Sequence, residues 1–160
     1  MTANLGRWPT GEHRILDLLS RGALERVPGD PRYTRDLIDR AGVKLRSAKV
    51  LAGADPETAY IVAYDAARFL LTALLAAQGL RPKASPEGGH RTVQDAIDAQ
   101  FPGRFRFFGR MRRLRNELEY PPLEATAPVQ PADVTDRIGE IDTALPGIVK
   151  LTSQLSLFIR

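Results

Sequence analysis

The sequence predicts an all-α fold, an up-and-down helical bundle of four to five main helices. Apolar residues recur at three- and four-residue spacing over several long stretches of the chain, which is the pattern of amphipathic helices. Capping residues and prolines stand at the starts of these stretches, as they do at helix N-termini. No run of alternating β-branched residues occurs, so we expect no sheet. Short connections between the stretches favour antiparallel neighbours.

The chain has 160 residues, a length that suits one domain with a sizeable core. We divide it into residues 1–30, a tail and a short helix, and residues 31–160, the bundle. Thr10 is placed to cap the short helix, whose apolar face carries Ile15 and Leu18.

Two long helices are predicted next. Asp30 caps the first, before a proline at the first helical position, and Gly53 ends it after about 20 residues. Asp55, also followed by a proline, caps the second, which runs through the most apolar part of the chain, residues 57–78. Its many alanines let neighbouring helices approach closely, so we expect this helix at the centre of the bundle.

Three helices complete the predicted bundle. Residues 90–100 form a shorter helix, and residues 104–120 form an arginine-rich helix that the following prolines close. The last helix begins at Pro131 and carries an apolar stripe almost to the end of the chain. Pro146 and Gly147 lie inside it, so we expect it to kink or split there.

The rare residue types exclude several kinds of chemistry. The chain has no Cys, and hence no disulfide, thiolate zinc site or thiol nucleophile. Its two histidines, His13 and His90, are far apart, so we expect no metal site and no cofactor. No apolar run approaches the roughly 20 residues that span a bilayer, and the N-terminus lacks a signal pattern. We therefore expect a soluble, cytoplasmic protein without a membrane partner.

Positive charge is concentrated in one predicted helix. The net charge is +4, and the 23 basic residues comprise 19 Arg and 4 Lys. Six arginines lie between Arg104 and Arg115 with no acidic residue among them. GC-rich coding alone also produces chains rich in Ala and Arg, so the clustering of the arginines is more informative than their total. Because an arginine fork binds phosphate bidentately, such a cluster is a candidate nucleic-acid interface.

At about 100° per residue, the arginine-rich helix has three faces. The core face carries Phe107, Met111, Leu114 and Leu118. The second, which we expect to be solvated, carries Arg106, Arg110, Arg113 and Glu117, with an ion pair between the last two. The third carries Arg112, Arg115, Asn116, Glu119 and Tyr120. A purely structural explanation of this face stays open: Arg115 would pair with Glu119, and Tyr120 would pack under the following prolines.

The third face contains a pattern, Arg115-Asn116-x-x-x-Tyr120, that resembles the motif of the HEPN (higher eukaryotes and prokaryotes nucleotide-binding) domain family. That motif is an Arg, usually followed by Asn, Asp or His, and then a His four to six residues beyond the Arg. The segment 55–80 and the Gly-Gly-His step that ends at His90 are also similar to HEPN sequences. The resemblance covers roughly residues 31–158.

The resemblance implies a function and a set of site residues. In that family the motif Arg and His meet across the two-fold interface of a homodimer and form a metal-independent endoribonuclease site. By resemblance, Arg115 would hold the scissile phosphate and Asn116 would be its polar neighbour. Tyr120 stands where the family has its His. A phenol is a weak proton acceptor at neutral pH, but it can donate a hydrogen bond or stack on a base.

Further candidates surround this motif. We expect three more arginines of the same helix to contact nucleic acid and two other residues to assist. These are Arg110, Arg112 and Arg113 in the first role, and His90 and Glu119 in the second. Because Tyr120 replaces the His, whether the protein is an enzyme stays open at this point.

Two functions remain open from the sequence. The first is a HEPN-like protein, related to toxin–antitoxin or defence systems, that binds RNA and cleaves it without a metal if its altered motif allows. The alternative is a non-catalytic dimeric interaction module that binds a partner such as a nucleotidyltransferase antitoxin, which the missing His favours. DNA binding through the same helix ranks last, because no helix-turn-helix spacing precedes it.

Overall fold

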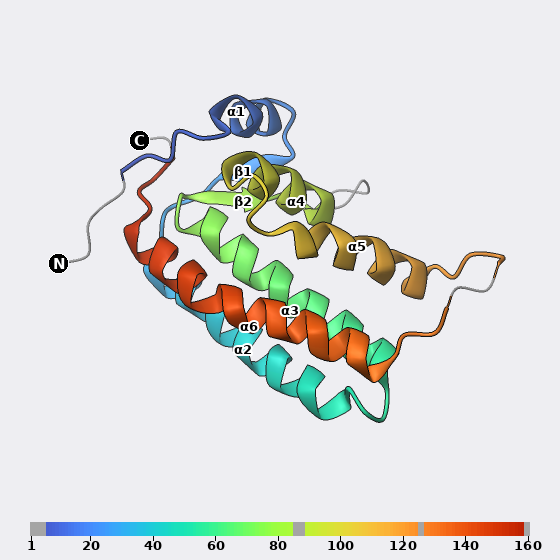
Figure 1. Ribbon diagram of the computed structural model, residues 1–160. Helices are drawn as coiled ribbons and strands as arrows, with labels where there is room; N and C mark the ends of the chain where they lie inside the picture. Colours follow the sequence, from blue (N-terminus) through green and yellow to red (C-terminus); the bar gives the residue numbers. More distant parts are fainter. Residues whose placement is uncertain (1–5, 85–88, 125–126, 159–160) are drawn as a thin grey trace.

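Helices dominate the computed structural model, which describes residues 6–84, 89–124 and 127–158 (Figure 1). The elements in chain order are α1 (Glu12–Ser20), β1 (Leu24–Arg26), α2 (Pro31–Leu51), α3 (Pro56–Ala76), β2 (Leu80–Pro82), α4 (Gly89–Gln100), α5 (Arg106–Glu119) and α6 (Pro131–Gln154). The predicted all-α bundle is confirmed, and the predicted helices appear in the predicted order.

Local capping explains where α2 and α3 begin. The Asp30 carboxylate accepts a hydrogen bond from the backbone N–H of Arg32 at 2.9 Å, at the start of α2. The Asp55 carboxylate accepts one from the backbone N–H of Thr58 at 3.1 Å, at the start of α3. Both caps satisfy N–H groups that a helix leaves without an internal partner. Both were predicted from the sequence, because capping depends only on near neighbours.

The start of α1 corrects one prediction. Gly11, not Thr10, is the N-cap of α1, and no side chain caps this helix. Gly11 has φ of 76°, and a Cβ built on it would lie 2.5 Å from the backbone carbon of Ala99. A glycine is therefore required here, because it tolerates positive φ and lets α1 begin directly against the end of α4. The contact between α1 and α4 therefore determines which residue type can stand at this N-cap.

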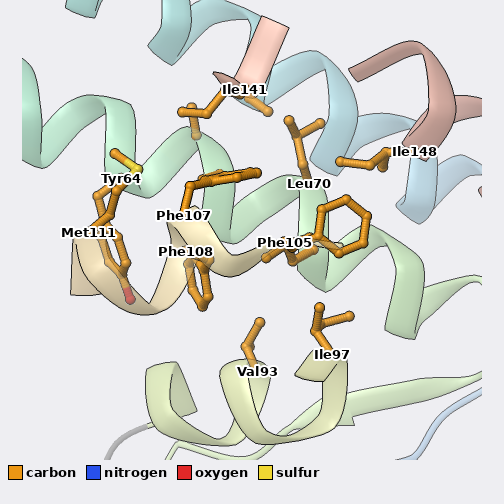
Figure 2. Close-up of a cluster of buried hydrophobic side chains, with 14 of the residues drawn as sticks. Tyr64, Leu70, Val93, Ile97, Phe105, Phe107, Phe108, Met111, Ile141 and Ile148 are labelled. Atoms are coloured by element: carbon orange, nitrogen blue, oxygen red, sulfur yellow. The ribbon is translucent and has the colours of Figure 1, made fainter. Parts of the chain in front are cut away.

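α3 lies at the centre of the bundle and contacts α2, α4, α5 and α6. Tyr64, Leu70 and Leu71 of α3 are almost completely buried. Figure 2 shows that Phe108 of α5 points toward Val93 of α4, whereas Phe107 lies on the side of Ile141 of α6. The segment before α2 joins the same core through Ile15, Leu18 and Leu24. The central position that the alanine-rich sequence predicted for this helix is confirmed.

The burial of α3 also corrects the expectation about apolar runs. Helix α3 does have the length and composition to cross a membrane. However, 72% of its most apolar window is buried inside the bundle. A long apolar helix that other helices cover is typical of the core of a soluble protein. The structure thus agrees with a soluble protein, although the sequence argument for it was wrong.

A small sheet is present where none was expected. β1 and β2 pair antiparallel, with Glu25 opposite Arg81, and the two side chains form an ion pair. Each strand has only three residues, too few to produce a detectable alternation of side chains. Gly79, with φ of 70°, turns the chain out of α3 and into β2. The pairing depends on where α1 and α3 end in space.

The last helix was predicted to kink or split at Pro146, and the structure shows that α6 is not split there. The helix is continuous from Pro131 to Gln154. Pro146 is exposed, so the backbone carbonyl that it leaves without a partner can face water. Ile141 and Ile148, on either side of the proline, are both buried. Packing on both sides therefore offsets the cost of the missing hydrogen bond.

A pair of buried glutamines joins the end of α3 to the end of α4. The Gln78 amide N–H donates to the Gln100 side-chain oxygen at 2.9 Å, and the Gln100 amide N–H donates back at 2.7 Å. Both residues are at most 1% exposed. The indole N–H of Trp8 donates to the backbone carbonyl of Gln100 at 2.8 Å. This network ties the N-terminal segment, α3 and α4 together with all its amide groups engaged.

Candidate functional site

The arginine-rich helix α5 is held in the bundle by a wider core face than the sequence predicted. Phe107 and Met111 are buried as expected, and Phe108 and Gly109 are buried as well, whereas Leu114 and Leu118 of the predicted core face are only half-buried. The Phe108 ring stacks on the Tyr64 ring of α3, with centroids 5.2 Å apart and planes 8° apart. These contacts fix the rotation of α5, and so they fix which of its arginines face solvent.

Gly109 brings α4 close to α5. A Cβ at Gly109 would lie 2.7 Å from the side-chain nitrogen of Gln94. Across this contact, the Arg112 Nε–H donates to the Gln94 side-chain oxygen at 2.6 Å. Arg112, predicted to bind nucleic acid, is thus partly buried and held by α4. The sequence pattern assigned Arg112 to the correct face of the helix but could not identify this partner.

The second face of α5 is solvated, as predicted. Arg106, Arg110 and Arg113 are all exposed. Arg110 forms an ion pair with Glu140 of α6 at 3.4 Å. No ion pair between Arg113 and Glu117 is found in the described part of the chain, so that predicted pair is wrong. Arg113 therefore remains available to contact an anionic ligand.

Arg115 is the most enclosed of the motif residues. Its side chain is 18% exposed and forms an ion pair with Glu119 at 2.8 Å. Its guanidinium carbon lies 5.8 Å from the centre of the Tyr64 ring, within the range of a cation–π contact. The predicted pair with Glu119 is therefore present, and Arg115 also contacts the Tyr64 ring of α3.

Asn116 and Tyr120 are exposed at the end of the helix. Tyr120 is 77% exposed and does not pack under the prolines that follow it. This excludes the structural explanation for the tyrosine. An exposed aromatic ring is able to stack on a base or contact another protein.

His90 lies at the start of α4 and contacts α3. Its Nδ1 atom is 3.0 Å from the Tyr64 hydroxyl oxygen, a hydrogen-bond distance. Since the Arg115 guanidinium lies over the same Tyr64 ring, Tyr64 connects His90 to the motif arginine. The sequence named His90 as an auxiliary candidate without any evidence that it approaches Arg115. The other histidine, His13, is exposed, as its sequence context suggested.

Arg68 lies close enough to Tyr64 and His90 for its charge to act on both. It was not predicted from the sequence. It follows Tyr64 by four residues on α3, so the two side chains share one face of that helix. Its guanidinium lies 4.8 Å from the Phe69 ring centre and 3.6 Å from the Asp65 carboxylate. The sequence feature that could have identified Arg68 is its four-residue spacing from Tyr64, within the segment that resembles HEPN sequences.

Burial and positive charge keep His90 neutral. Burial is the main cause that lowers the pKa of His90 to about 4, and the charges of Arg68 and Arg115 lower it further. Burial also raises the pKa of the Tyr64 hydroxyl to about 12. Near neutral pH, both partners of the hydrogen bond are therefore uncharged. A negative charge bound beside the imidazole would offset the contribution of the arginines and so favour its protonation at a higher pH.

The basic site is the name we use for Tyr64, Arg68, His90 and Arg115, which come from α3, α4 and α5. Its guanidinium groups can bind an anion, and its imidazole can exchange a proton. In the described part of the chain, no group of three or more His, Cys, Asp or Glu side chains could hold a metal ion. The fold and these side chains together define a class only coarsely: an α-helical bundle with a cluster of arginines around a buried tyrosine and a histidine. Comparisons with protein-family models, with curated proteins and with solved structures found no match.

The low pKa of His90 predicts how the stability of the fold changes with pH. Because this pKa, about 4, lies below the ordinary value of 6.5, the unfolded chain binds the proton more readily than the native state. The free energy of unfolding should therefore decrease as the pH falls from about 6.5 to about 4. His90 is only half-buried, so solvent screening limits the expected loss to about 1–2 kcal/mol.

Urea unfolding at several pH values measures this effect. The variant His90→Asn keeps a polar atom near the Nδ1 position and should lack most of the pH dependence in this window. The capping carboxylates Asp30 and Asp55 have a pKa lowered from 3.8, so their loss of stability begins at lower pH. Equal slopes for the wild type and the variant would show that His90 titrates like an exposed histidine.

Proposed function

We propose that this protein binds RNA through its phosphates, with Arg115 as the central ligand. The observation that carries this proposal is the placement of Arg115, which is partly buried, lies over the ring of Tyr64, the hydrogen-bond partner of His90, and is followed in the chain by the exposed Asn116 and Tyr120. Such an arrangement can bind one phosphate firmly while leaving an amide and an aromatic ring for the adjoining nucleotide. The resemblance of this segment to the HEPN motif also supports it.

The exposed arginines supply the second part of the interface. Arg106, Arg110 and Arg113 face solvent on the same helix, so they add electrostatic attraction without specificity. Tyr120 supplies a stacking surface for a base. Single-stranded RNA is the favoured ligand, because its unstacked bases are free to contact such a ring. Cleavage would require a proton acceptor other than Tyr120, since a phenol is a weak base near neutral pH.

A partner-binding module is the second candidate, and the exposed apolar side chains after α5 favour it. Tyr120 is 77% exposed, and Leu123 is fully exposed. Large apolar side chains that lie close together at the surface are typical of protein contacts. The homodimer and the nucleotidyltransferase-type antitoxin that the HEPN resemblance implies stay predictions, and they would use this end of the helix.

Replacing Arg115 with alanine tests the proposed function. We expect affinity for a fluorescently labelled single-stranded RNA to fall about tenfold or more, because a charged hydrogen bond to phosphate contributes about 1.5–3 kcal/mol. The slope of log affinity against log salt concentration should also decrease by about one. Fluorescence anisotropy at several salt concentrations measures both quantities, and a sequencing gel of the same RNA detects cleavage.

Arg40→Ala is the matched control for this experiment. Arg40 is exposed on α2 and pairs with Asp36 on its own helix, so its loss changes net charge equally at a remote place. We expect this control to bind RNA almost as tightly as the wild type. Equal affinities for wild type and Arg115→Ala would refute the assignment. A protein that dimerises but binds no RNA at low salt would instead support the partner-binding module.

A further inference from the structure

Positive charge is in excess around His90. The charged groups that act on its imidazole are Asp65 and Arg68 from α3, and Arg112 and Arg115 from α5. Three cations therefore face one anion. The Glu119 carboxylate, which pairs with Arg115, is a second anion, and positive charge is still in excess. A site with surplus cations from two helices is arranged to bind an anion.

Two nitrogen atoms in this site lack a partner. The Nε atoms of Arg68 and Arg115 are buried and have no hydrogen-bond acceptor within the described residues. Buried N–H groups in native proteins nearly always have an acceptor, so each N–H group without one requires an explanation. A ligand with several acceptor oxygens could satisfy donors from both guanidinium groups. Both side chains remain partly exposed, at 26% and 18%, which leaves the site accessible.

The hydrogen bond to Tyr64 orients the His90 ring. Because Nδ1 is engaged by the Tyr64 hydroxyl, Nε2 is the ring nitrogen that remains for a ligand. Tyr64 is itself fixed, since it is completely buried and stacked on Phe108. The imidazole is thus oriented by Tyr64 of α3, which Phe108 of α5 fixes in turn, and a ligand-binding histidine is positioned in this way.

We propose that Arg68, His90 and Arg115 form a phosphoryl-binding site in which His90 takes up a proton when the phosphoryl group binds. This inference rests on the proposed function for the identity of the ligand, the phosphodiester of RNA. The physical reason is electrostatic: burial and the three nearby arginines disfavour a further positive charge on the imidazole, and a bound anion offsets the contribution of the arginines. In this reading His90, not Tyr120, is the group of the site that exchanges protons.

Nuclear magnetic resonance tests the proton uptake directly, because the chain has only two histidines. The first probe is dimethyl phosphate, an anion that does not titrate near neutral pH. The second is a 2′-O-methylated oligoribonucleotide, which cannot be cleaved at its 2′ oxygens. At pH 6, adding either probe should shift the His90 ring nitrogens toward the imidazolium form. The His13 signals should not move, and chloride at the same ionic strength should have no such effect.

The pH dependence of affinity provides a second readout. Binding that takes up one proton should become about tenfold tighter for each pH unit below the pKa of His90 in the complex. This gain should stop near the pKa of the free protein, about 4. His90→Asn should bind with little pH dependence. Arg68→Gln should weaken binding and abolish the shift of His90, whereas Arg40→Gln on the exposed side of α2 should do neither.

The outcomes separate this inference from the proposed function. If RNA binding requires Arg115 while His90 stays neutral and Arg68→Gln has no effect, the inference is overturned and the proposed function stands. If dimethyl phosphate protonates His90 but RNA does not bind, the inference stands and the proposed function is wrong. If neither probe changes the His90 signals at high concentration, the phosphoryl-binding site does not exist.

Discussion

Replacing Phe108 with alanine should lower the free energy of unfolding by about 3–5 kcal/mol, as truncation of a fully buried phenylalanine usually does. Phe108 is 1% exposed and lies among side chains from α3 and α4 (Figure 2). It also stacks on Tyr64, so its loss should loosen the hydrogen bond that holds His90. Denaturant unfolding followed by circular dichroism measures the first effect. The pKa of His90 in the folded variant, expected nearer its ordinary value, measures the second.

Two further substitutions make the Phe108 result specific. Phe108→Leu keeps most of the volume, so its cost should be much smaller, about 1–2 kcal/mol. Val50→Ala changes an apolar residue that is 82% exposed on α2, so its effect should stay within about 0.5 kcal/mol. If Phe108→Ala unfolded like Val50→Ala, the packing of α5 on α3 described above would be wrong.

Breaking the glutamine pair from one side should cost about 1–3 kcal/mol, because the remaining amide is left buried without its partner. In Gln100→Met, the Gln78 carbonyl oxygen loses the donor that lies 2.7 Å away. Gln78 keeps only its own donation to the backbone carbonyl of Leu74. The loss should appear as a lower denaturant midpoint with an unchanged slope, since the fold itself is retained.

The double variant Gln78→Met, Gln100→Met is the informative control for this pair. Both buried polar groups are then replaced by apolar groups of similar shape, so much of the lost stability should return. Strictly additive losses would mean that the two amides do not depend on each other for hydrogen bonding. The backbone carbonyl of Gln100, which accepts from Trp8, is present in every variant and does not confuse the comparison.

Helix starts illustrate what could be predicted without a structure. Asp30 and Asp55 were identified as caps, and both carboxylates accept hydrogen bonds from the first turn of their helix. Gly11, in contrast, replaces the expected Thr10 because α1 begins against the backbone of Ala99. Capping within one helix involves residues two or three apart, whereas the contact at Gly11 joins residues far apart in the chain.

The residues of the candidate site likewise fall into those that local sequence patterns predicted and those that only the tertiary structure identified. The face of α5 that carries Arg112 and Arg115 followed from helical periodicity, whereas Tyr120 lies just beyond the helix, as its C-cap residue with a non-helical backbone. Arg68 was missed, although it lies on the same face of α3 as Tyr64, because nothing in the sequence showed that this face meets α4 and α5. The orientation of His90 toward Tyr64 likewise depends on how α4 packs, which no local pattern encodes.

The amino-acid sequence by itself determined the all-α class, the order of the helices and the arginine-rich face of α5, because these follow from periodicity and capping between near neighbours. Only the tertiary structure decided that Arg68, His90 and Arg115 surround Tyr64. It also brought the three-residue strands together and kept α6 continuous through Pro146. The physical reason is that each of these features arises from packing between segments distant in sequence, where burial outweighs local preference.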